Sequence, residues 1–472
     1  MAQAGVPPVS PSSSKRSRSK DSTQSTTNSS LNTPAAHTPF ATPSASANSL
    51  VIPSSVPGTP ASGEYTQDAT PYPAFLKSSR DVHAKWARLD WTQLDRYRES
   101  AQALGAEQPN KWARCMGEDY ASRNRYANVD PYQANRVRLD VPEGQFDYIN
   151  ASPIVLTLSK SGTALRYIAT QGPKADSWSH IWRMIWKENA SPAVIVMLTQ
   201  THEANREKCY PYYPQSPSSP DMHINEHDEF EDGLIHKLHL ASFDTDEDAR
   251  TQVREIDMTT EDGSDSKKIW HLLFAAWPDF SVPEGADRAA MLKLVDISRA
   301  KNSDNATNPR IVHCSAGIGR SGTFIALDWL LQELEEGSLD NTSEDPIMKV
   351  VEQLRDQRSG MVQSKTQFQI IYDVLRERWR ERWITLHPRE ASRLGITSAS
   401  ACTSTPDNEP ALKRQKSMRD GETHSELLQP DQIRDWPSPA SSARASSNPP
   451  GARKELEAEL MDANMRYEKG KT

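Results

Sequence analysis

The sequence predicts an α/β domain whose central β-sheet is covered by helices on both faces. Residues 193–198 (AVIVML) and 311–312 form continuous apolar runs, which are typical of strands buried on both sides of a sheet. The second run leads directly into a glycine-rich turn, HCSAGIGRSG. Residues 323–334 then repeat their apolar side chains at helical period and stop before Gly337. The predicted order is therefore strand, glycine-rich turn, helix.

Three further helices are predicted on either side of these elements. The first begins at Asp81, a candidate N-cap, and its apolar face comprises Val82, Trp86, Leu89, Leu94, Tyr97, Ala101 and Leu104. The other two are predicted at 345–355 and 366–383. The apolar side of the last one carries Phe368, Ile371, Val374 and Leu375.

The aromatic residues predict one large core in the middle of the chain. Eleven of the 12 tryptophans lie between Trp86 and Trp383, whereas residues 1–73 contain none. The hydrophobic fraction of 36% is low for a globular chain, as expected when polar tails dilute it. We expect a disordered Ser/Thr/Pro-rich tail at 1–74, a folded domain at 75–385 and a disordered, charged tail at 386–472.

Charge and cysteine content narrow the class of protein. The formal net charge of -8 gives no general attraction to nucleic acid or to acidic membranes, so an anion site must be local. The 4 cysteines form no CxxC pair, which indicates a reducing compartment. The sequence contains neither an apolar signal-peptide core nor a run of ~18 apolar residues. We expect a soluble protein of the cytoplasm, and the basic stretches at 15–20 and 413–416 extend that expectation to the nucleus.

The turn between strand and helix has the residues of a phosphate cradle. Its backbone N–H groups are expected to point inward as an anion nest, and the start of the following helix adds partial positive charge. Glycine lets the backbone curl this tightly, and Arg320 offers a planar fork that matches two phosphoryl oxygens. The glycines of the turn are Gly317, Gly319 and Gly322.

The same electrostatic field predicts a nucleophile at Cys314. A cysteine pKa can fall from about 8.5 to about 3.5–7.5 at a helix N-terminus or beside cations, which leaves a thiolate at neutral pH. Ser321 adds a hydroxyl that can stabilise the sulfur when it leaves. A Cys-x5-Arg pair alone occurs by chance in many chains, and buried cysteines are usually inert. The full string between a strand and a helix is a much stronger signal.

This string resembles the signature loop of the protein tyrosine phosphatases, and further segments resemble that family's motifs in the same order. They are NRYANVDPYQANRVRL from Asn124, DYINAS from Asp147, YIATQGP from Tyr167, WPDFSVP from Trp277 and MVQSKTQ from Met361. The resemblance covers residues 75–385. It implies a cysteine-based tyrosine phosphatase fold with a highly twisted, mixed central sheet. It also implies a non-receptor, tyrosine-specific enzyme with a single catalytic domain, and the Ser/Thr-Pro-rich tails resemble those of fungal enzymes that act on mitogen-activated protein kinases.

The resemblance also assigns roles to residues. Asp279 corresponds to the general acid on a mobile loop, and Gln363 to the glutamine that positions water, with Gln367 as its helper. Tyr126 and Phe280 correspond to the aromatic pair that holds the substrate ring, and Tyr126 also sets the pocket depth that favours phosphotyrosine. The phosphate is expected to bind the loop residues Ser315, Ala316, Gly317, Ile318 and Gly319.

Supporting roles follow from the same resemblance for His313, Glu203, Lys208 and Trp277. Glu203 corresponds to a glutamate that orients the signature arginine, and Lys208 to a lysine that approaches the acid loop. Two positions depart from the family pattern. Asn128 replaces a frequent aspartate that holds the substrate backbone, and Ser281 replaces a frequent glycine in the acid loop.

Other functions were weighed against this hypothesis. A dual-specificity phosphatase is disfavoured by Tyr126, and a phosphotyrosine-binding module with little turnover would be expected to lack Cys314, Arg320 or Asp279. His223 and His227 are spaced HxxxH, with His236 and His239 nearby, but the glutamate of HINEH is not placed as in the HExxH zinc motif. All four histidines are expected on the surface, the first two in a loop. The expected partners are phosphotyrosine proteins, without a metal or cofactor.

Overall fold

A mixed β-sheet with helices on both faces forms the folded part of the chain. A computed structural model describes residues 69–77, 81–102, 110–278, 281–302, 304–340 and 342–396. Its helices are α1 (Val82–Gln102), α2 (Glu118–Arg123), α3 (Ser179–Glu188), α4 (Gly285–Lys301), α5 (Gly319–Glu336), α6 (Pro346–Gln357), α7 (Lys365–Leu386) and α8 (Pro388–Arg393), with 3-10 turns η1 (Ala74–Leu76) and η2 (Gln133–Asn135). Its strands are β1 (Ala151–Thr157), β2 (Ala164–Thr170), β3 (Ala193–Met197), β4 (His202–Glu203), β5 (Arg206–Glu207), β6 (Asp221–Ile224), β7 (His236–Asp246), β8 (Thr251–Thr260), β9 (Ser266–Phe274) and β10 (Arg310–His313).

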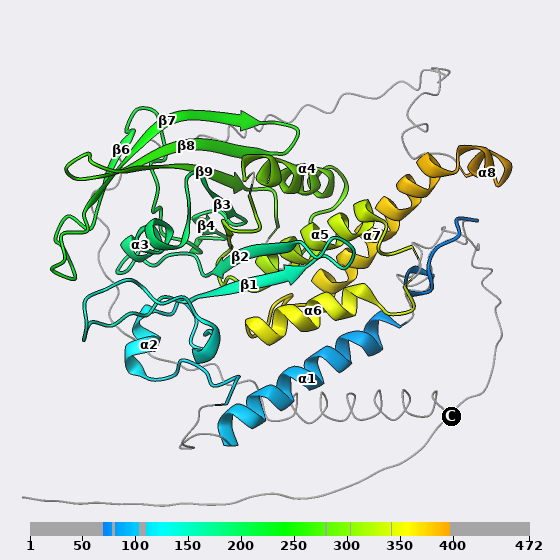
Figure 1. Ribbon diagram of the computed structural model, residues 1–472, viewed down its shortest axis with the longest axis horizontal. Helices are drawn as coiled ribbons and strands as arrows, with labels where there is room; N and C mark the ends of the chain where they lie inside the picture. The colour runs from blue at the N-terminus through cyan, green and yellow to red at the C-terminus, as the bar shows by residue number, and fades with distance from the viewer. Residues whose placement is uncertain are drawn as a thin grey trace, which may run out of the picture. The chain divides into compact units, whose positions relative to one another are not determined.

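Eight strands form the main sheet in the order β1-β2-β10-β3-β9-β8-β7-β6 (Figure 1). Strand β10 lies between β2 and β3 and is parallel to both, and β3 is also parallel to β9. The remaining pairs are antiparallel. The predicted mixed sheet is confirmed, and the strand that precedes the glycine-rich turn lies inside it, with a parallel neighbour on each side.

The side chains of β3 alternate between two hydrophobic cores. Val194 and Val196 pack on the face covered by α4, α5, α6 and α7, whereas Ile195 and Met197 pack on the face covered by α3 (Figure 1). Both faces are therefore removed from water. This explains why the strand is continuously apolar instead of alternating with polar residues.

The later helices begin and end at residues suited to those positions. Helix α5 ends at Gly337, whose φ of 75° is left-handed and therefore favours glycine. Helix α6 begins after Asp345, whose side chain accepts hydrogen bonds from the N–H groups of Ile347 and Met348. Ser364 caps α7 by accepting from the N–H of Gln367. All three helices end two or three residues after their predicted C-terminal residues, and α5 begins four residues earlier than predicted.

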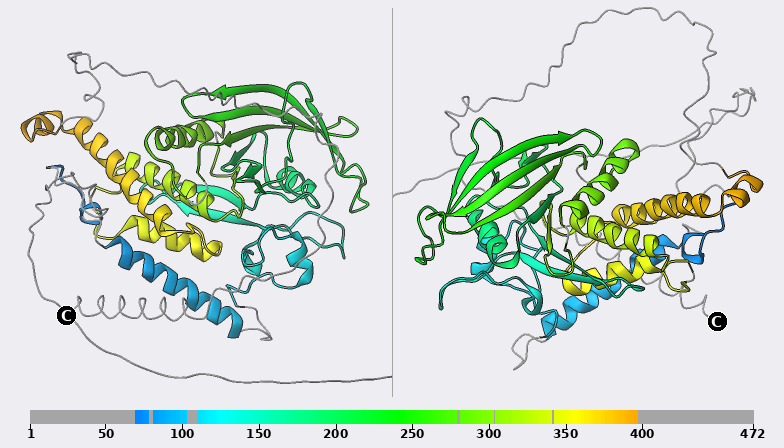
Figure 2. Two further views of the ribbon diagram at one scale, coloured as in Figure 1. Left: turned by 180° about the vertical axis from the view of Figure 1, so that it is seen from behind. Right: turned by 45° about the horizontal axis from the view of Figure 1, so that its top comes forward.

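Helix α1 has a different buried face from the one predicted. It begins at Val82, and Val82 and Leu89 are buried as expected. Leu94, however, is exposed, because the second half of the buried face is formed by Gln93, Arg96 and Ser100. These polar residues lie at helical spacing toward α6, which runs alongside α1 (Figure 2). A search for apolar periodicity could not find a buried face made of polar side chains.

The described fold extends beyond the predicted domain boundary at residue 385. Helix α8 follows α7 after a single intervening residue, and Ala391 and Ile396 are buried in the same core as α5 and α7. At the other end, Tyr72 is also buried in this core. Most of the two predicted tails, and both basic stretches, lie outside the described residues.

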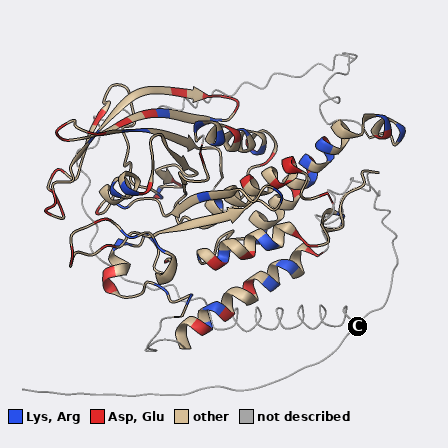
Figure 3. Cartoon of the chain, in the orientation of Figure 1, with Lys and Arg blue, Asp and Glu red and all other residues tan. Residues whose placement is uncertain are grey.

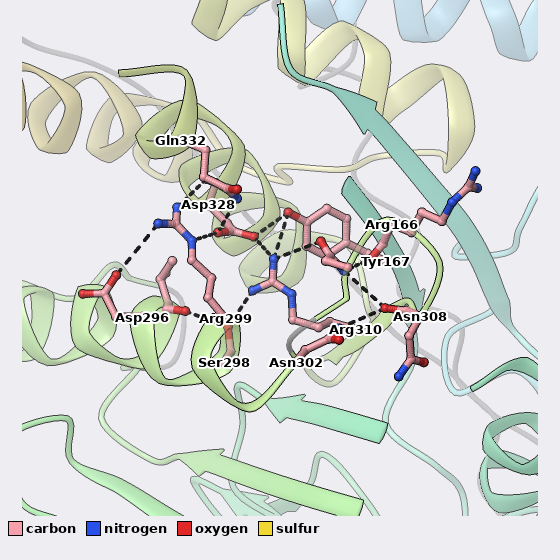
Figure 4. A network of polar contacts seen from close by, with 12 residues as sticks. Arg166, Tyr167, Asp296, Ser298, Arg299, Asn302, Asn308, Arg310, Asp328 and Gln332 are labelled. Carbon is pink, nitrogen blue, oxygen red and sulfur yellow. Dashed lines mark hydrogen bonds and ion pairs between the residues drawn. The ribbon is translucent and has the colours of Figure 1, made fainter. Parts of the chain in front are cut away.

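A buried cluster of charges joins two helices and two strands (Figure 4). The carboxylate of Asp328 on α5 accepts hydrogen bonds from Arg299 on α4, Arg310 on β10 and the hydroxyl of Tyr167 on β2. Burial works to raise the pKa of Asp328, but Arg310 and Arg299 hold it below its usual value. The carboxylate is therefore ionised, and it fixes the four elements to one another.

Acidic and basic residues are interspersed along α1, α6 and the second half of α7 (Figure 3). No single-sign patch of the kind that binds nucleic acid forms on these helices. Within the described ranges, no helix has both the length and the apolar composition that a membrane crossing requires.

Candidate active site

The turn between β10 and α5 is closed around the sulfur of Cys314. Strand β10 ends at His313, and α5 begins at Gly319. The N–H of Gly317 donates to the Sγ of Cys314 at 3.3 Å, so a backbone donor of the turn points inward, as predicted. Gly317 has a φ of 71°, and a Cβ on it would lie 2.1 Å from the carbonyl oxygen of Thr170. Only glycine fits at this position.

Arg358 binds the outer side of the turn. Its Nε donates to the carbonyl of Gly317 at 2.9 Å, and its Nη2 donates to the carbonyl of Ala316 at 3.3 Å and to Oδ1 of Asn150 at 2.8 Å. Because these carbonyls face Arg358, the intervening N–H groups are left facing the sulfur. Burial lowers the pKa of Arg358 to about 10, so the side chain stays cationic at neutral pH. Arg358 was not predicted from the sequence, since a single arginine between two helices carries no signal of its own.

Arg320 is held in position by Glu203. Its Nη1 donates to Oε1 of Glu203 at 2.6 Å, and its Nη2 donates to Oε2 at 2.9 Å, which is the bidentate geometry expected of an arginine–carboxylate pair. Burial alone would raise the pKa of Glu203, yet the hydrogen bonds from Arg320 and Thr199 hold it below its usual value. Glu203 precedes the tight turn of the β4–β5 hairpin, where Ala204 and Asn205 both have positive φ.

Two other predicted residues lie around this pair. The Nζ of Lys208 is 3.9 Å from Oε2 of Glu203, and both side chains are largely buried. The hydroxyl of Ser321 is fully buried at the start of α5 and has no hydrogen-bond partner among the described residues. A buried hydroxyl without a partner is costly unless a ligand or a changing charge uses it.

His313 belongs to a buried chain of hydrogen bonds behind the turn. Burial lowers its pKa to about 4, so the ring is neutral at pH 7. Since a carbonyl can only accept, Nδ1 carries the proton and donates to the oxygen of Cys314 at 3.2 Å. Nε2 then accepts from the hydroxyl of Tyr212 at 2.7 Å, and that hydroxyl also contacts Nε2 of His271 at 3.2 Å. His313 therefore orients the backbone of Cys314 without adding charge.

A cavity of about 590 Å³ opens above the sulfur. Its wall unites most of the predicted site residues, namely Tyr126, Asn128, Glu203, Lys208, Ser281, Cys314, Ser315, Ala316, Gly319, Arg320, Gln363 and Gln367. The hydroxyl of Tyr126 contacts Oγ of Ser315 at 2.8 Å, so its ring stands at the rim beside the turn. A Cβ on Gly319 would lie 3.0 Å from the Oε1 of Gln363, which places that amide directly over the turn.

The acid loop is described only at its two ends. Trp277 is buried, and its Nε1 donates to the carbonyl of Ser281 at 3.1 Å, which ties the ends of the loop together. The carbonyl of Pro278 lies 3.5 Å from Nη2 of Arg320. The two residues between them, Asp279 and Phe280, lie outside the described residues. Their predicted roles remain proposals.

The histidines considered for a metal site are not gathered together. No group of three or more His, Cys, Asp or Glu side chains that could hold a metal ion occurs in the described part of the chain. His223 lies on strand β6, not in the predicted loop. His236 was expected on the surface but is buried against Trp186, and burial lowers its pKa to about 4.

A sulfur inside an anion nest, beside a clamped arginine and beneath two glutamine amides, defines the class of cysteine-dependent phosphate-ester hydrolases. Residues 120–377 match the family model described as protein-tyrosine phosphatase. The chain belongs to the protein-tyrosine phosphatase family, as predicted. It is accordingly a phosphatase that hydrolyses phosphotyrosine in proteins, and a cysteinyl-phosphate intermediate is general to that family.

Related proteins agree with this assignment. Tyrosine-protein phosphatase 1 of Saccharomyces cerevisiae is 36% identical over 277 residues, which cover 53% of this chain and 80% of the relative. Tyrosine-protein phosphatase 2 of Schizosaccharomyces pombe is 36% identical over 258 residues, which cover 54% of this chain but 33% of the relative. Mouse tyrosine-protein phosphatase non-receptor type 20 is 35% identical over 255 residues, which cover 54% of this chain and 53% of the relative. These relatives support the predicted non-receptor type, and two of them are fungal.

A solved structure supports the fold. It concerns the "PTPN18 fingerprint on distinct HER2 tyrosine phosphorylation sites" and is similar to this chain with a TM-score of 0.50 at 25% sequence identity. The similarity covers 63% of this chain and 95% of that one. The predicted fold class is confirmed.

Proposed function

We propose that Cys314 is the nucleophile of a two-step hydrolysis whose acid and base are both Asp279. In the first step the Cys314 thiolate attacks phosphorus in line with the ester bond. The S–P bond forms, the P–O bond to the tyrosine ring breaks, and Asp279 gives its proton to the leaving phenol oxygen. Arg320 and the N–H groups of the turn bind the phosphoryl oxygens throughout, which supports the charge that develops in the transition state.

In the second step water releases the phosphate. Gln363 positions the water, with Gln367 beside it, and Asp279 now accepts a proton from it. The P–O bond to water forms as the S–P bond breaks, and the sulfur leaves as a thiolate. Ser321 is proposed to stabilise this thiolate, because its buried hydroxyl has no other partner among the described residues and can donate to the departing sulfur.

The observation that carries this proposal is that one cavity wall joins Cys314, Arg320, Gln363 and Tyr126. Their positions in the chain span more than two hundred residues, so the fold alone brings them together. We infer that Tyr126 at the rim deepens the pocket, so that a phosphotyrosine reaches the sulfur and the shorter phosphoserine and phosphothreonine do not. Phe280 is proposed as the opposite side of the ring clamp.

The test compares phosphotyrosine and phosphothreonine peptides of the same sequence with the full chain. We expect turnover of the phosphotyrosine peptide only. Cys314→Ser should abolish turnover and retain binding, and Asp279→Ala should slow turnover and retain binding. Equal turnover of both peptides would favour a dual-specificity enzyme, and binding without turnover by the unaltered chain would favour a binding module.

We further propose phosphotyrosine-containing mitogen-activated protein kinases as substrates, and the cytoplasm and nucleus as the location. The Ser/Thr-Pro-rich composition of residues 1–74 and the basic stretches at 15–20 and 413–416 support this. The Asp279→Ala chain should retain such kinases from a cell extract, and release them when vanadate is added. Retention of unrelated phosphoproteins instead would contradict the substrate assignment.

A further inference from the structure

The four residues before Gln363 form a constrained turn. Gly360 has a φ of 72° and Val362 a φ of 57°, and the latter is rare for a β-branched side chain. Val362 is fully buried, and its N–H donates to the carbonyl of Ile318 at 3.1 Å. Ile318 belongs to the phosphate turn, which is residues 314–318 between β10 and α5. A backbone in this region persists only where its surroundings hold it. The position of Gln363 therefore depends on whatever fixes residues 359–362.

Arg355 at the end of α6 holds the inner side of this turn. Its Nε donates to the carbonyl of Met361 at 3.0 Å, and its Nη2 donates to the carbonyl of Val362 at 3.0 Å. Arg355 is itself buried. Its remaining Nη1 donates to Oδ1 of Asp90 on α1 at 2.9 Å. The guanidinium thus connects α1 to the two carbonyls immediately before Gln363.

Helix α1 makes two further polar contacts with the same turn. The hydroxyl of Tyr97 lies 2.5 Å from Oγ of Ser359. The buried amide of Gln93 accepts from the N–H of Gly360 at 3.4 Å and donates to the hydroxyl of Tyr132 at 3.1 Å. The contacts of Gln93 explain why a polar side chain is buried at this position of α1.

We propose that α1 is a brace for the turn at residues 359–362, the glutamine turn. In this brace, Asp90, Gln93 and Tyr97 are positioning residues for the water-directing amide of Gln363. This rests on the proposed role of Gln363. The brace lies outside residues 120–377, the span matched by the family model. Neither α1 nor Arg355 lines the cavity above Cys314, so the contacts of Asp90, Gln93 and Tyr97 act on Gln363 through the turn.

This arrangement affects the two chemical steps unequally. Attack by Cys314 uses the phosphate turn and Arg320, whereas release of the phosphate uses Gln363. Loosening the brace should therefore slow hydrolysis of the cysteinyl phosphate and leave its formation intact. When hydrolysis limits turnover, kcat and KM fall together and kcat/KM is unchanged, because kcat/KM reports only the steps up to the first irreversible one.

The experiment measures steady-state and burst kinetics of the full chain with an aryl phosphate. For Asp90→Asn we expect kcat and KM each to fall about tenfold, kcat/KM to stay within about twofold, and a burst of phenol equal to the enzyme concentration. Asp90→Glu should restore much of the loss. The matched control is Asp95→Asn on the same helix, whose exposed carboxylate pairs with the exposed Arg98 and whose loss should leave all parameters unchanged.

Tyr97→Phe removes one hydroxyl and no charge, so it tests the brace even if Asp90→Asn does not fold. It should give the same pattern with a smaller fall in kcat. Equal falls in kcat and kcat/KM, or no change in folded Asp90→Asn and Tyr97→Phe, would overturn the brace. A Gln363→Ala chain that turns over normally and shows no burst would instead contradict the proposed function on which the brace rests.

Discussion

Helix α5 passes through two buried polar clusters, one at its N-terminus and one in its middle. The arginines of the two clusters differ in whether carboxylates pair with them. In the middle, Arg310 and Arg299 both bind the carboxylate of Asp328, and Arg299 also binds Glu335 at 3.0 Å. Two cations meet three carboxylates there, because Nη1 of Arg299 also lies 4.0 Å from Oδ1 of Asp296. Around the phosphate turn, Arg320 is paired with Glu203, but within the described part of the chain Arg358 has only carbonyl, hydroxyl and amide oxygens as its hydrogen-bond partners.

The difference separates a cluster that holds the fold from a cluster that holds a ligand. A closed set of charges needs nothing from outside and joins α4, α5, β2 and β10 (Figure 4). Among the described residues, Arg358 makes no hydrogen bond to a carboxylate, and the turn also has the inward N–H of Gly317 and the unpartnered hydroxyl of Ser321. A thiolate or a phosphoryl group supplies the missing negative charge.

The largest expected effect comes from breaking the charge cluster around Asp328. Asp328→Asn leaves Arg310 buried without a carboxylate, which should lower the free energy of unfolding by roughly 3–5 kcal/mol. Urea denaturation measures this. The folded fraction should keep its kcat within a few-fold. Glu335→Gln, which removes one of the two exposed carboxylates beside Arg299, is the matched control and should cost less than about 1 kcal/mol. Equal losses for the two variants would mean that the cluster does not hold the fold.

The next largest effect is expected from a substitution in the cluster around the phosphate turn. Arg320→Lys keeps the charge but loses the fork that binds Glu203 and two phosphoryl oxygens, so kcat/KM should fall by about 10²- to 10³-fold. The free energy of unfolding should change much less than in Asp328→Asn. Steady-state kinetics and urea denaturation of the same preparation decide the matter. A stability loss as large as that of Asp328→Asn would remove the distinction between the clusters.

A pH dependence should follow from the neutral His313 behind the turn. Its pKa is lowered to about 4 by burial, whereas the unfolded chain takes up that proton near pH 6.5. The unfolded state therefore binds more protons between these values, and the free energy of unfolding should fall by roughly 2–3 kcal/mol as pH drops from about 6.5 to about 4. Replacing the group with His313→Gln should flatten this part of the profile. An unchanged profile would show that His313 accepts a proton in the folded protein.

The smallest effect is expected at Ser321. Removing its hydroxyl in Ser321→Ala takes one neutral hydrogen bond from the departing sulfur, worth about 1 kcal/mol, so kcat should fall about five- to tenfold. Since formation of the cysteinyl phosphate does not use this hydroxyl, kcat/KM should change little. Thr at this position should restore kcat. A fall in kcat/KM of the same size would place Ser321 in the first step instead.

The sequence predicted the parts of the site that have a local signal. Residues 193–198 and 311–312 are apolar because both faces of their strands are buried, and the phosphate turn stands between a strand and a helix. Arg358 was missed because its role depends on carbonyls that are distant in sequence. Gln93 was not predicted on the buried face of α1, because its partner is a turn more than two hundred and fifty residues away.

The most direct test of the account is to trap the covalent intermediate. The Gln363→Ala chain, mixed with a radiolabelled aryl phosphate and quenched in acid within milliseconds, should carry close to one phosphoryl group per molecule. Peptide mapping should locate it on Cys314, and the Cys314→Ser chain should carry none and turn over no substrate. Label on another residue, or turnover by Cys314→Ser, would contradict the claim that the sulfur in this turn is the nucleophile.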